Sequence, residues 1–366
     1  MTVPPATTLP QLLHPATYRP CEWDLAADPS GRAYWVGLFI THLDLLTDLI
    51  VQEYPRTNGR QVAAFRRDYV ATMQSFEADP ERFAPADVLR LTALRRDLLT
   101  RHGFPDPFLG VKQRENEAAL ALLPGVLAEL EALPANAQLE ALTVGLMAGN
   151  IFDLGSPATI AQYQAGLAGF REARARQPAR PWLMDDLEPW QARWRDAPYR
   201  HVFWFVDNAG SDIWLGCIPL VRWMLRAGAR VTLAANSGPA LNDITASELV
   251  ALLPQAGAAV PDLGEALAGG RLAVVATGSD LPLLDLTRLD ARCTAAAADA
   301  DLIILHGMGR GIESNFSVRL RCDSLHTASL KDAQVAGQIG GRLFDCVCAL
   351  RPGGCPQATD VKKTAP

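Results

Sequence analysis

The spacing of apolar residues changes about halfway along the chain. From Ala33 to about Glu172 they recur every three or four residues, as in YWVGLFITHLDLLTDLIVQEY and ADVLRLTALRRDLLTRHG, which predicts amphipathic helices. A further stretch of this kind, ENEAALALLPGVLAELEAL from Glu115, contains Pro124, where we expect a helix start or a kink. The first half of the chain is therefore predicted to be helical.

From about His201 the apolar residues form short continuous runs that alternate with helix-like segments. Continuous runs are typical of strands in a parallel sheet that helices cover on both faces. Strands are expected at 201–206, 230–236, 271–278, 301–307 and 343–350. Helices are expected at 212–227, 246–254, 288–298 and 325–338. We predict a three-layer α/β/α fold, with a doubly wound, mostly parallel sheet and an N-terminal all-helical domain.

This pattern suggests two domains in the 366 residues. We expect a mainly helical domain over 1–190, in which 1–20 are poorly ordered. An α/β/α domain that binds metal and phosphate would follow over 191–355, and a tail over 356–366.

Composition and charge limit which partners and which compartment can be expected. A net charge of -6 without a basic patch argues against nucleic acid as a partner. The N-terminus lacks the basic start and apolar core of a signal peptide. No apolar run approaches the roughly 20 residues needed to span a bilayer. We therefore expect a cytoplasmic protein without a membrane partner.

The seven cysteines show no framework spacing, which predicts reduced thiols. Cys346, Cys348 and Cys355 could suggest zinc, but no second pair accompanies them, and we interpret them as structural or incidental thiols.

Polar side chains and glycines concentrate where the predicted strands end. In open parallel sheets, ligands bind beyond the carboxyl ends of the strands. Asp207 and Asn208 follow the first strand, and Asp243 closes the loop after the second. Carboxylate and amide oxygens suit Mg²⁺ or Mn²⁺ and tolerate Co²⁺ or Ni²⁺. These three residues are candidate ligands of one divalent cation.

Helix capping is the alternative for the same residues. Either member of the Asp207-Asn208 pair could cap the helix that begins near Asp212, although Ser211 already lies where a cap is wanted. Thr245-x-x-Glu248 matches a capping box for the next helix, so Asp243 would not be needed as a cap and could bind a metal. The residues alone leave capping and metal binding equally open.

Two features could hold a phosphate. Gly307, Gly309 and Gly311 would let backbone N–H groups approach an anion, although a plain tight turn has the same pattern. Arg310 carries a guanidinium, which pairs well with phosphate oxygens. Lys331 could add positive charge, but by itself it is more typical of a solvated helix lysine.

Longer motifs resemble a known family, the metal-dependent phosphatases formerly called domain of unknown function 89. The similarity is to the branch that contains the phosphatase domain of pantothenate kinase-fused proteins, here in its stand-alone form, and it covers about residues 20–352. The motifs that carry it are DPFLGVKQRENEAAL (106–120), GLMAGNIFDLG (145–155), RPWLMDD (180–186), FVDNAGSDIWLGCIPLVRWML (205–225), ANSGPALNDITASEL (235–249), GMGRGIESNF (307–316), and LRCDSL (320–325) followed by Lys331.

The resemblance implies one divalent metal (Mn, Co, Ni or Mg) held by Asp207, Asn208 and Asp243, with Lys331 completing the catalytic set. It also implies a substrate- or phosphate-binding role for a wider set, with backbone N–H groups of the 236–239 and 307–311 loops contributing. This set is Asn236, Ser237, Gly309, Arg310, Asn150, Asp153 and, less securely, Asn116. Attack by water and transient phosphorylation of Asp207 both remain open.

The implied reaction is hydrolysis of a small-molecule phosphate monoester in metabolite damage control. The favoured substrate is 4′-phosphopantetheine or its oxidised or damaged forms. Sugar phosphates are an alternative, although the chain lacks the GDLNYRK-like stretch of another branch. His326 also stands where some relatives carry a lysine, so the charge around the substrate is expected to differ.

Three other classes of protein are alternatives for this sequence. A haloacid dehalogenase-like phosphatase needs a second Asp at the position of Ala209. An S-adenosylmethionine-dependent methyltransferase would want a glycine-rich loop after the first strand and an acid at the end of the second, and neither is clear. A non-catalytic binding protein is the third.

Overall fold

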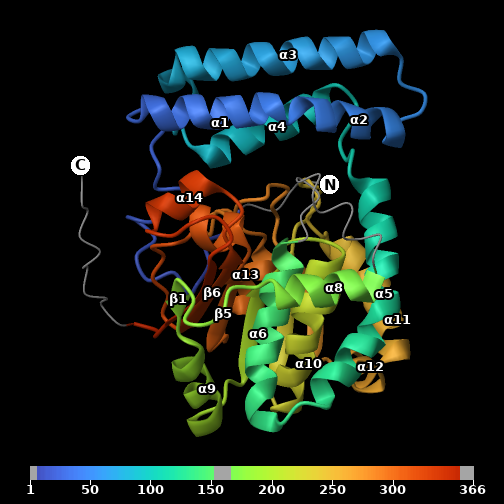
Figure 1. Ribbon diagram of the computed structural model, residues 1–366. Coiled ribbons are helices and arrows are strands. Elements are labelled where there is room, and N and C mark those ends of the chain that lie inside the picture. The colour runs from blue at the N-terminus through green and yellow to red at the C-terminus, as the bar shows by residue number, and fades with distance from the viewer. Residues whose placement is uncertain (1–5, 152–165, 355–366) are drawn as a thin grey trace.

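The computed structural model describes residues 6–151 and 166–354 of the chain (Figure 1). One seven-stranded sheet has the order β1-β7-β6-β5-β2-β3-β4. Neighbouring strands are parallel except for β6 and β7, which are antiparallel. The strands are β1 (Met184–Asp185), β2 (His201–Phe205), β3 (Arg230–Ala235), β4 (Leu272–Ala276), β5 (Leu302–His306), β6 (Asp323–Ser329) and β7 (Cys346–Arg351). The predicted doubly wound, mostly parallel sheet is confirmed.

Helices and loops cover both faces of this sheet. Because side chains alternate along a strand, Val202 and Trp204 enter one hydrophobic cluster, and Phe203 and Phe205 enter another. The second cluster is closed by α13 (Ala291–Ala297) and by the N-terminal segment that contains Leu9. Helices that contribute to the first cluster are α5 (Leu109–Glu131), α6 (Ala135–Ile151), α8 (Gly166–Ala175), α9 (Leu187–Asp196), α10 (Ile218–Arg226), α11 (Ala246–Ala259) and α12 (Pro261–Ala268).

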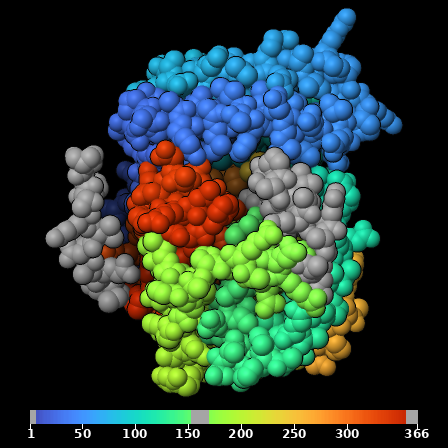
Figure 2. Space-filling view, in the orientation of Figure 1, coloured from blue at the N-terminus to red at the C-terminus, as the bar shows by residue number. Residues whose placement is uncertain are grey.

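A separate layer of helices lies across one end of the sandwich, at the top of Figures 1 and 2. Its apolar side chains form a third cluster, which also takes in Leu283, Leu330 and Val347 from the α/β body. The layer is therefore joined to the sheet through a hydrophobic contact. Its helices are α1 (Pro29–Thr41), α2 (Leu43–Glu53), α3 (Gly59–Ala78), the short 3₁₀ turn η1 (Pro80–Phe83) and α4 (Val88–Arg101).

Helices α1 and α2 correct one expectation about the sequence. Together they span Pro29–Glu53, a stretch long and apolar enough to cross a membrane by length and composition. We had expected no such stretch. In this structure 44% of its most apolar window is buried inside the protein, where it packs in the same cluster as α3 and α4. The expectation that the protein has no membrane partner stays a prediction.

Strand β6 replaces most of the helix predicted at 325–338, of which only α14 (Ala333–Gln338) is helical. The strand was hard to predict because it contains buried polar residues, of which Thr327 and Ser329 have partners inside the protein. The Thr327 hydroxyl pairs with His306, and the Ser329 hydroxyl donates to the Met147 carbonyl. His326, expected to alter the charge around the substrate, is buried in β6, and this burial lowers its pKa to about 3.

Part of the N-terminal segment packs against the rest of the protein. From residue 6, Leu9 and Leu12 are buried and Thr7 is bridged to Leu289. The predicted poor order of 1–20 stays a prediction. The domain boundary at 190 stays a prediction, since α5, α6 and α8 precede it in sequence yet share a hydrophobic cluster with the sheet. The predicted tail 356–366 lies outside the described residues.

Candidate active site

Asp207 and Asp243 meet at the carboxyl edge of the sheet because β2 and β3 are parallel neighbours. Beyond the strands, the two loops continue to pair: Ala209 N donates to Asn242 O at 2.9 Å, and Ile244 N donates to Asp207 O at 3.0 Å. Both carboxylates are buried, with 6% and 2% of the residue exposed. The structure thus brings together the acids that the sequence placed 36 positions apart.

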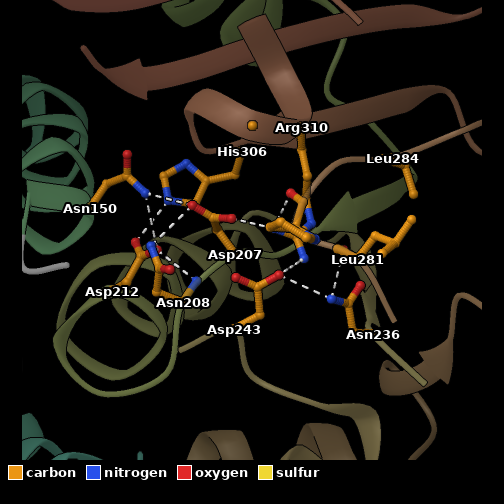
Figure 3. A network of polar contacts seen from close by, with 12 residues as sticks. Asn150, Asp207, Asn208, Asp212, Asn236, Asp243, Leu281, Leu284, His306 and Arg310 are labelled. Carbon is orange, nitrogen blue, oxygen red and sulfur yellow. Dashed lines mark hydrogen bonds and ion pairs between the residues drawn. The ribbon is translucent and has the colours of Figure 1, made fainter. Parts of the chain in front are cut away.

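Arg310 lies between these two carboxylates (Figure 3). It belongs to η3 (Met308–Glu313), a π-helical turn directly after β5. Its Nη1 pairs with Asp207, and its Nη2 lies 2.6 Å from Asp243 Oδ2. We predicted that Arg310 contacts phosphate; here the guanidinium instead bridges the acids.

Burial and charge oppose one another in this ion-pair group. Burial raises the pKa of Asp207, although the positive charges of Arg310 and Lys331 counteract it. Burial would lower the pKa of Arg310, but Asp243 and Asp207 outweigh it, so that pKa is raised. The arginine therefore stays charged and offsets much of the negative charge of the two acids.

The side-chain amide of Asn208 is held in one orientation. Its Nδ2 donates to Asp207 Oδ2 at 3.0 Å and to Asp212 Oδ2 at 3.2 Å, and its backbone N donates to the same Asp212 oxygen at 3.0 Å. Because both acids accept from the nitrogen, the amide oxygen remains as an acceptor for another group. Asn208 can therefore offer a cation the same kind of atom as its neighbouring acids do.

Asp212 is the site residue that sequence reasoning missed. It begins η2 (Asp212–Cys217), a π-helical turn before α10, and its Oδ1 lies 2.8 Å from His306 Nε2. Burial would raise the pKa of Asp212, but the charge and hydrogen bond of His306 hold it below its ordinary value. We expected Ser211 to cap this helix; its side chain makes no capping hydrogen bond, and Asp212 binds the Asn208 N–H instead.

Asp212, His306 and Cys217 also lie close enough together to be possible metal ligands. All three are fully buried. Asp212 and His306 are already hydrogen-bonded to each other, and His306 Nδ1 pairs with Thr327. Burial raises the pKa of the Cys217 thiol well above its ordinary value, which disfavours the thiolate that metals need. We interpret this group as the support that fixes Asn208.

Helix α6 brings Asn150 to the site from a distant part of the chain. Gly149 makes this possible, because a Cβ there would lie only 3.0 Å from Asp212 Cα. Asn150 Nδ2 donates to Asp207 Oδ2 at 3.0 Å and to Asp212 Oδ2 at 3.1 Å, and Lys331 Nζ donates to Asn150 O at 2.9 Å. Asn150 and Lys331 thus join the predicted site, whereas Asp153 lies outside the described residues.

Three other predicted residues, Asn236, Asn116 and Ser237, support the site indirectly or lie outside it. Asn236 Nδ2 donates to Asp243 Oδ2 and to Leu281 O, both at 3.0 Å, and so steadies the acid. Asn116 Oδ1 accepts from Gly210 N and Trp214 Nε1 and so holds the turn after Asn208, and its substrate-binding role stays a prediction.

Ser237 corrects our expectation for the 236–239 loop. It is exposed, its N–H donates to Ser279 O at 2.7 Å, and its hydroxyl accepts from Gly278 N at 2.7 Å. Its backbone N–H is therefore used within the loops, and a phosphate-binding role for its hydroxyl stays a prediction. The predicted capping box downstream is confirmed: Thr245 Oγ1 accepts from Glu248 N, and Glu248 Oε2 accepts from Thr245 N.

Above the acids lies a pocket of about 630 Å³ between the α/β body and the helical layer. Its floor contains Asp207, Asn208 and Asp243, with Gly309 and Lys331 on the walls. Burial, reinforced by the negative charge of Asp332, raises the pKa of Glu313 in this wall to about 8. Most of the remaining lining is apolar: Trp35, Leu38, Phe39, Val88, Ile151, Leu241, Leu283, Met308, Leu343 and Phe344. The other polar residues of the lining are His42, Thr92, Arg95, Asn242 and Asp332.

Comparison with known proteins places this site in a family. The damage-control phosphatase ARMT1-like domain matches residues 45–347. A damage-control phosphatase of Arabidopsis thaliana is 37% identical over 323 residues, covering 86% of each chain. A DUF89 family protein from Pyrococcus horikoshii shares the fold, with a TM-score of 0.63, 16% identity, and coverage of 86% of this chain and 96% of that one.

Two further relatives are longer proteins. Pantothenate kinase 2 of Oryza sativa subsp. japonica is 35% identical over 380 residues, which cover 96% of this chain and 42% of that protein. The 4′-phosphopantetheine phosphatase of Mus musculus is 33% identical over 395 residues, or 94% of this chain and 48% of that protein. This chain thus spans less than half the length of either. From its fold, its motifs and the extent of these matches, the chain belongs to the damage-control phosphatase family with the ARMT1-like domain.

Proposed function

We propose that this protein is a metal-dependent phosphatase that hydrolyses a small-molecule phosphate monoester. One observation carries the proposal: Asp207 and Asp243 converge on the floor of a pocket large enough for a metabolite, beside an oriented amide and basic side chains. Acids at the carboxyl edge of a parallel sheet are well placed for a ligand that enters from above.

The residues of the floor fit a divalent cation. Two carboxylates and the Asn208 amide oxygen form a hard-oxygen donor set of the kind that Mg²⁺ and Mn²⁺ prefer. The pairing of Asp207 and Asp243 with one guanidinium supports this fit, because the two acids already share a positive charge. A cation held by Asp207, Asn208 and Asp243 would supply Lewis-acid neutralisation of phosphate charge.

The chain's own residues would complete the site. Lys331, whose ammonium is held by Asn150 O at the pocket wall, adds positive charge near the phosphoryl oxygens. Arg310 would share its guanidinium between the acids and the phosphate. We favour water as the attacking group over transient phosphorylation of Asp207, because Asn150 and Asn208 both donate to Asp207 Oδ2 and occupy that oxygen.

For the substrate we propose 4′-phosphopantetheine or its oxidised or damaged forms. The Mus musculus relative is named for this substrate. The pocket supports the proposal, since its polar floor gives way to an apolar mouth where Leu343 and Phe344 are 44% and 53% exposed. An extended arm with apolar segments would bury this surface, whereas a sugar would leave it in contact with hydroxyl groups.

Turnover by the purified protein tests the proposal. With Mn²⁺, Co²⁺, Ni²⁺ or Mg²⁺ supplied one at a time, we expect hydrolysis of p-nitrophenyl phosphate and faster hydrolysis of 4′-phosphopantetheine than of sugar phosphates, all abolished by a chelator. Asp243→Asn should lower turnover by at least about 100-fold. Asp262→Asn, at a surface ion pair with Arg222, is the matched control and should retain it. An inactive wild type with every metal would refute the phosphatase assignment, and chelator-resistant turnover would refute metal dependence.

A further inference from the structure

A second basic side chain of the pocket comes from the helical layer. Arg95 lies on α4 and lines the wall near Asn242 and Asp243. Only 8% of the residue is exposed, yet it makes no hydrogen bond or ion pair with any residue in 6–151 or 166–354. Among the residues that the structure describes, it lies over the Phe39 ring, whose centroid is 4.7 Å from the guanidinium carbon.

Other buried cations of this protein are paired. Lys112, completely buried, lies 3.0 Å from both Asp106 and Glu248. Arg310, 1% exposed, is shared between two acids. A buried charge without a partner is costly, because water no longer solvates it. The unpaired state of Arg95 therefore calls for an explanation that Lys112 and Arg310 do not need.

Arg95 keeps a positive charge in the wall of the pocket. Burial lowers the pKa of Arg95, and the nearby Asp243 carboxylate only partly counteracts this shift. A guanidinium keeps its charge even so, because its ordinary pKa lies far above neutrality. Contact with the Phe39 ring restrains the plane of the guanidinium, so little freedom is lost when it binds a ligand.

We propose that Arg95 is a substrate-binding residue, which holds non-bridging oxygens of the phosphoryl group from the side opposite Lys331. The inference rests on the proposed phosphatase function and adds a role for the helical layer. The planar guanidinium of arginine matches the geometry of a phosphoryl group, because it can donate two parallel hydrogen bonds to two of its oxygens. Since α4 carries this group, the helical layer takes part in recognition as well as covering the sheet.

Removal of the guanidinium at constant bulk tests the assignment. In Arg95→Met we expect KM for p-nitrophenyl phosphate and the inhibition constant of inorganic phosphate to rise together, by about 10- to 100-fold, as expected for a charge-assisted hydrogen bond. The affinity for Mn²⁺, measured calorimetrically without substrate, should stay within about twofold. Arg95→Lys should recover part of the phosphate affinity. The matched control is Arg101→Met, which removes an exposed arginine from the same helix.

Thermal unfolding separates binding from a structural role. Loss of an unpaired buried charge should leave the melting temperature unchanged or raise it, whereas loss of a structural cation–π contact would lower it in Arg95→Met and not alter phosphate inhibition. A lower melting temperature together with unchanged phosphate inhibition in Arg95→Met would therefore overturn the inference. A rise in KM with unchanged inhibition by inorganic phosphate would also overturn it, because Arg95 would then bind another part of the substrate. If the wild type hydrolyses no phosphate ester, the proposed function fails instead, and phosphate protection against unfolding in wild type and Arg95→Met still tests the contact.

Discussion

Gly307 offers a direct test of how closely the backbone approaches Asp207. Its φ of 91° and ψ of 155° fall in a region that is essentially restricted to glycine. A Cβ added there would lie 2.0 Å from Asp207 Oδ2, far inside van der Waals contact. Gly307→Ala must therefore distort the turn after β5, displace the Asp207 carboxylate, or do both.

The expected cost can be divided into two parts. Forcing alanine into this conformation costs about 1–3 kcal/mol. Displacing Asp207 Oδ2 breaks the 3.0 Å hydrogen bonds from Asn150 and Asn208, each worth about 1.5–3 kcal/mol at a charged acceptor. Because the carboxylate can relax into partial contacts, we expect the free energy of unfolding to fall by about 2–5 kcal/mol.

Denaturant titration and metal calorimetry on the same preparation would measure both effects. Misplacement of Asp207 should also weaken Mn²⁺ binding and lower turnover by about 100-fold. Gly37→Ala is the matched control, since this exposed glycine lies inside α1 with nothing within 4 Å of the added Cβ. It should raise stability by about 0.5–1 kcal/mol. Wild-type stability, metal affinity and turnover in Gly307→Ala would refute the reasoning.

Two further outcomes are expected. Burial raises the pKa of Asp87 to about 6 in the folded protein, so the folded state binds more protons than the unfolded state and loses stability as pH rises from about 4 through 6. Asp87→Asn should remove up to about 3 kcal/mol of this loss between pH 4 and 7.5, and an unchanged pH profile of unfolding would contradict it. Asp212→Asn should lower Mn²⁺ affinity by about 10- to 100-fold, because a single uncharged oxygen then replaces the two carboxylate oxygens that bind Asn208 and His306. Unchanged calorimetric affinity would count against that role.

The α/β architecture was predictable because a parallel sheet imposes a pattern on consecutive residues. His201–Phe205 and Leu302–His306 read as strands since both of their faces are buried and both are apolar. Strand β6 was misread because its buried positions include Ser324, Thr327 and Ser329. Polar side chains in a buried strand are satisfied by distant partners, here on β5 and α6, and no local pattern reveals those partners.

The acids of the site were predictable for a similar reason. Asp207 and Asp243 follow strands of one parallel sheet, so their placement at the same edge followed from the fold class. The pairing of β2 with β3, which makes them neighbours, was not predicted. In the sequence, Asp212 resembles an ordinary acid in the first turn of a helix. Its partner His306 ends β5, and the two residues meet only because β5 pairs with β2 in the sheet. The availability of the Ser237 N–H was overestimated because a loop sequence does not show which N–H groups neighbouring loops already use.

A charged residue on the apolar face of a predicted helix indicates a buried charge, and the sequence contains two such residues. Leu91, Arg95 and Leu98 are spaced by four and three positions, which places Arg95 on the buried face of α4. Lys112 has the same placement in α5, between Phe108 and Ala119. Periodicity alone therefore identifies both as buried cations. It does not show that Lys112 has acids on two other segments while Arg95 has none among the described residues, and this difference separates a structural charge from one available to a ligand.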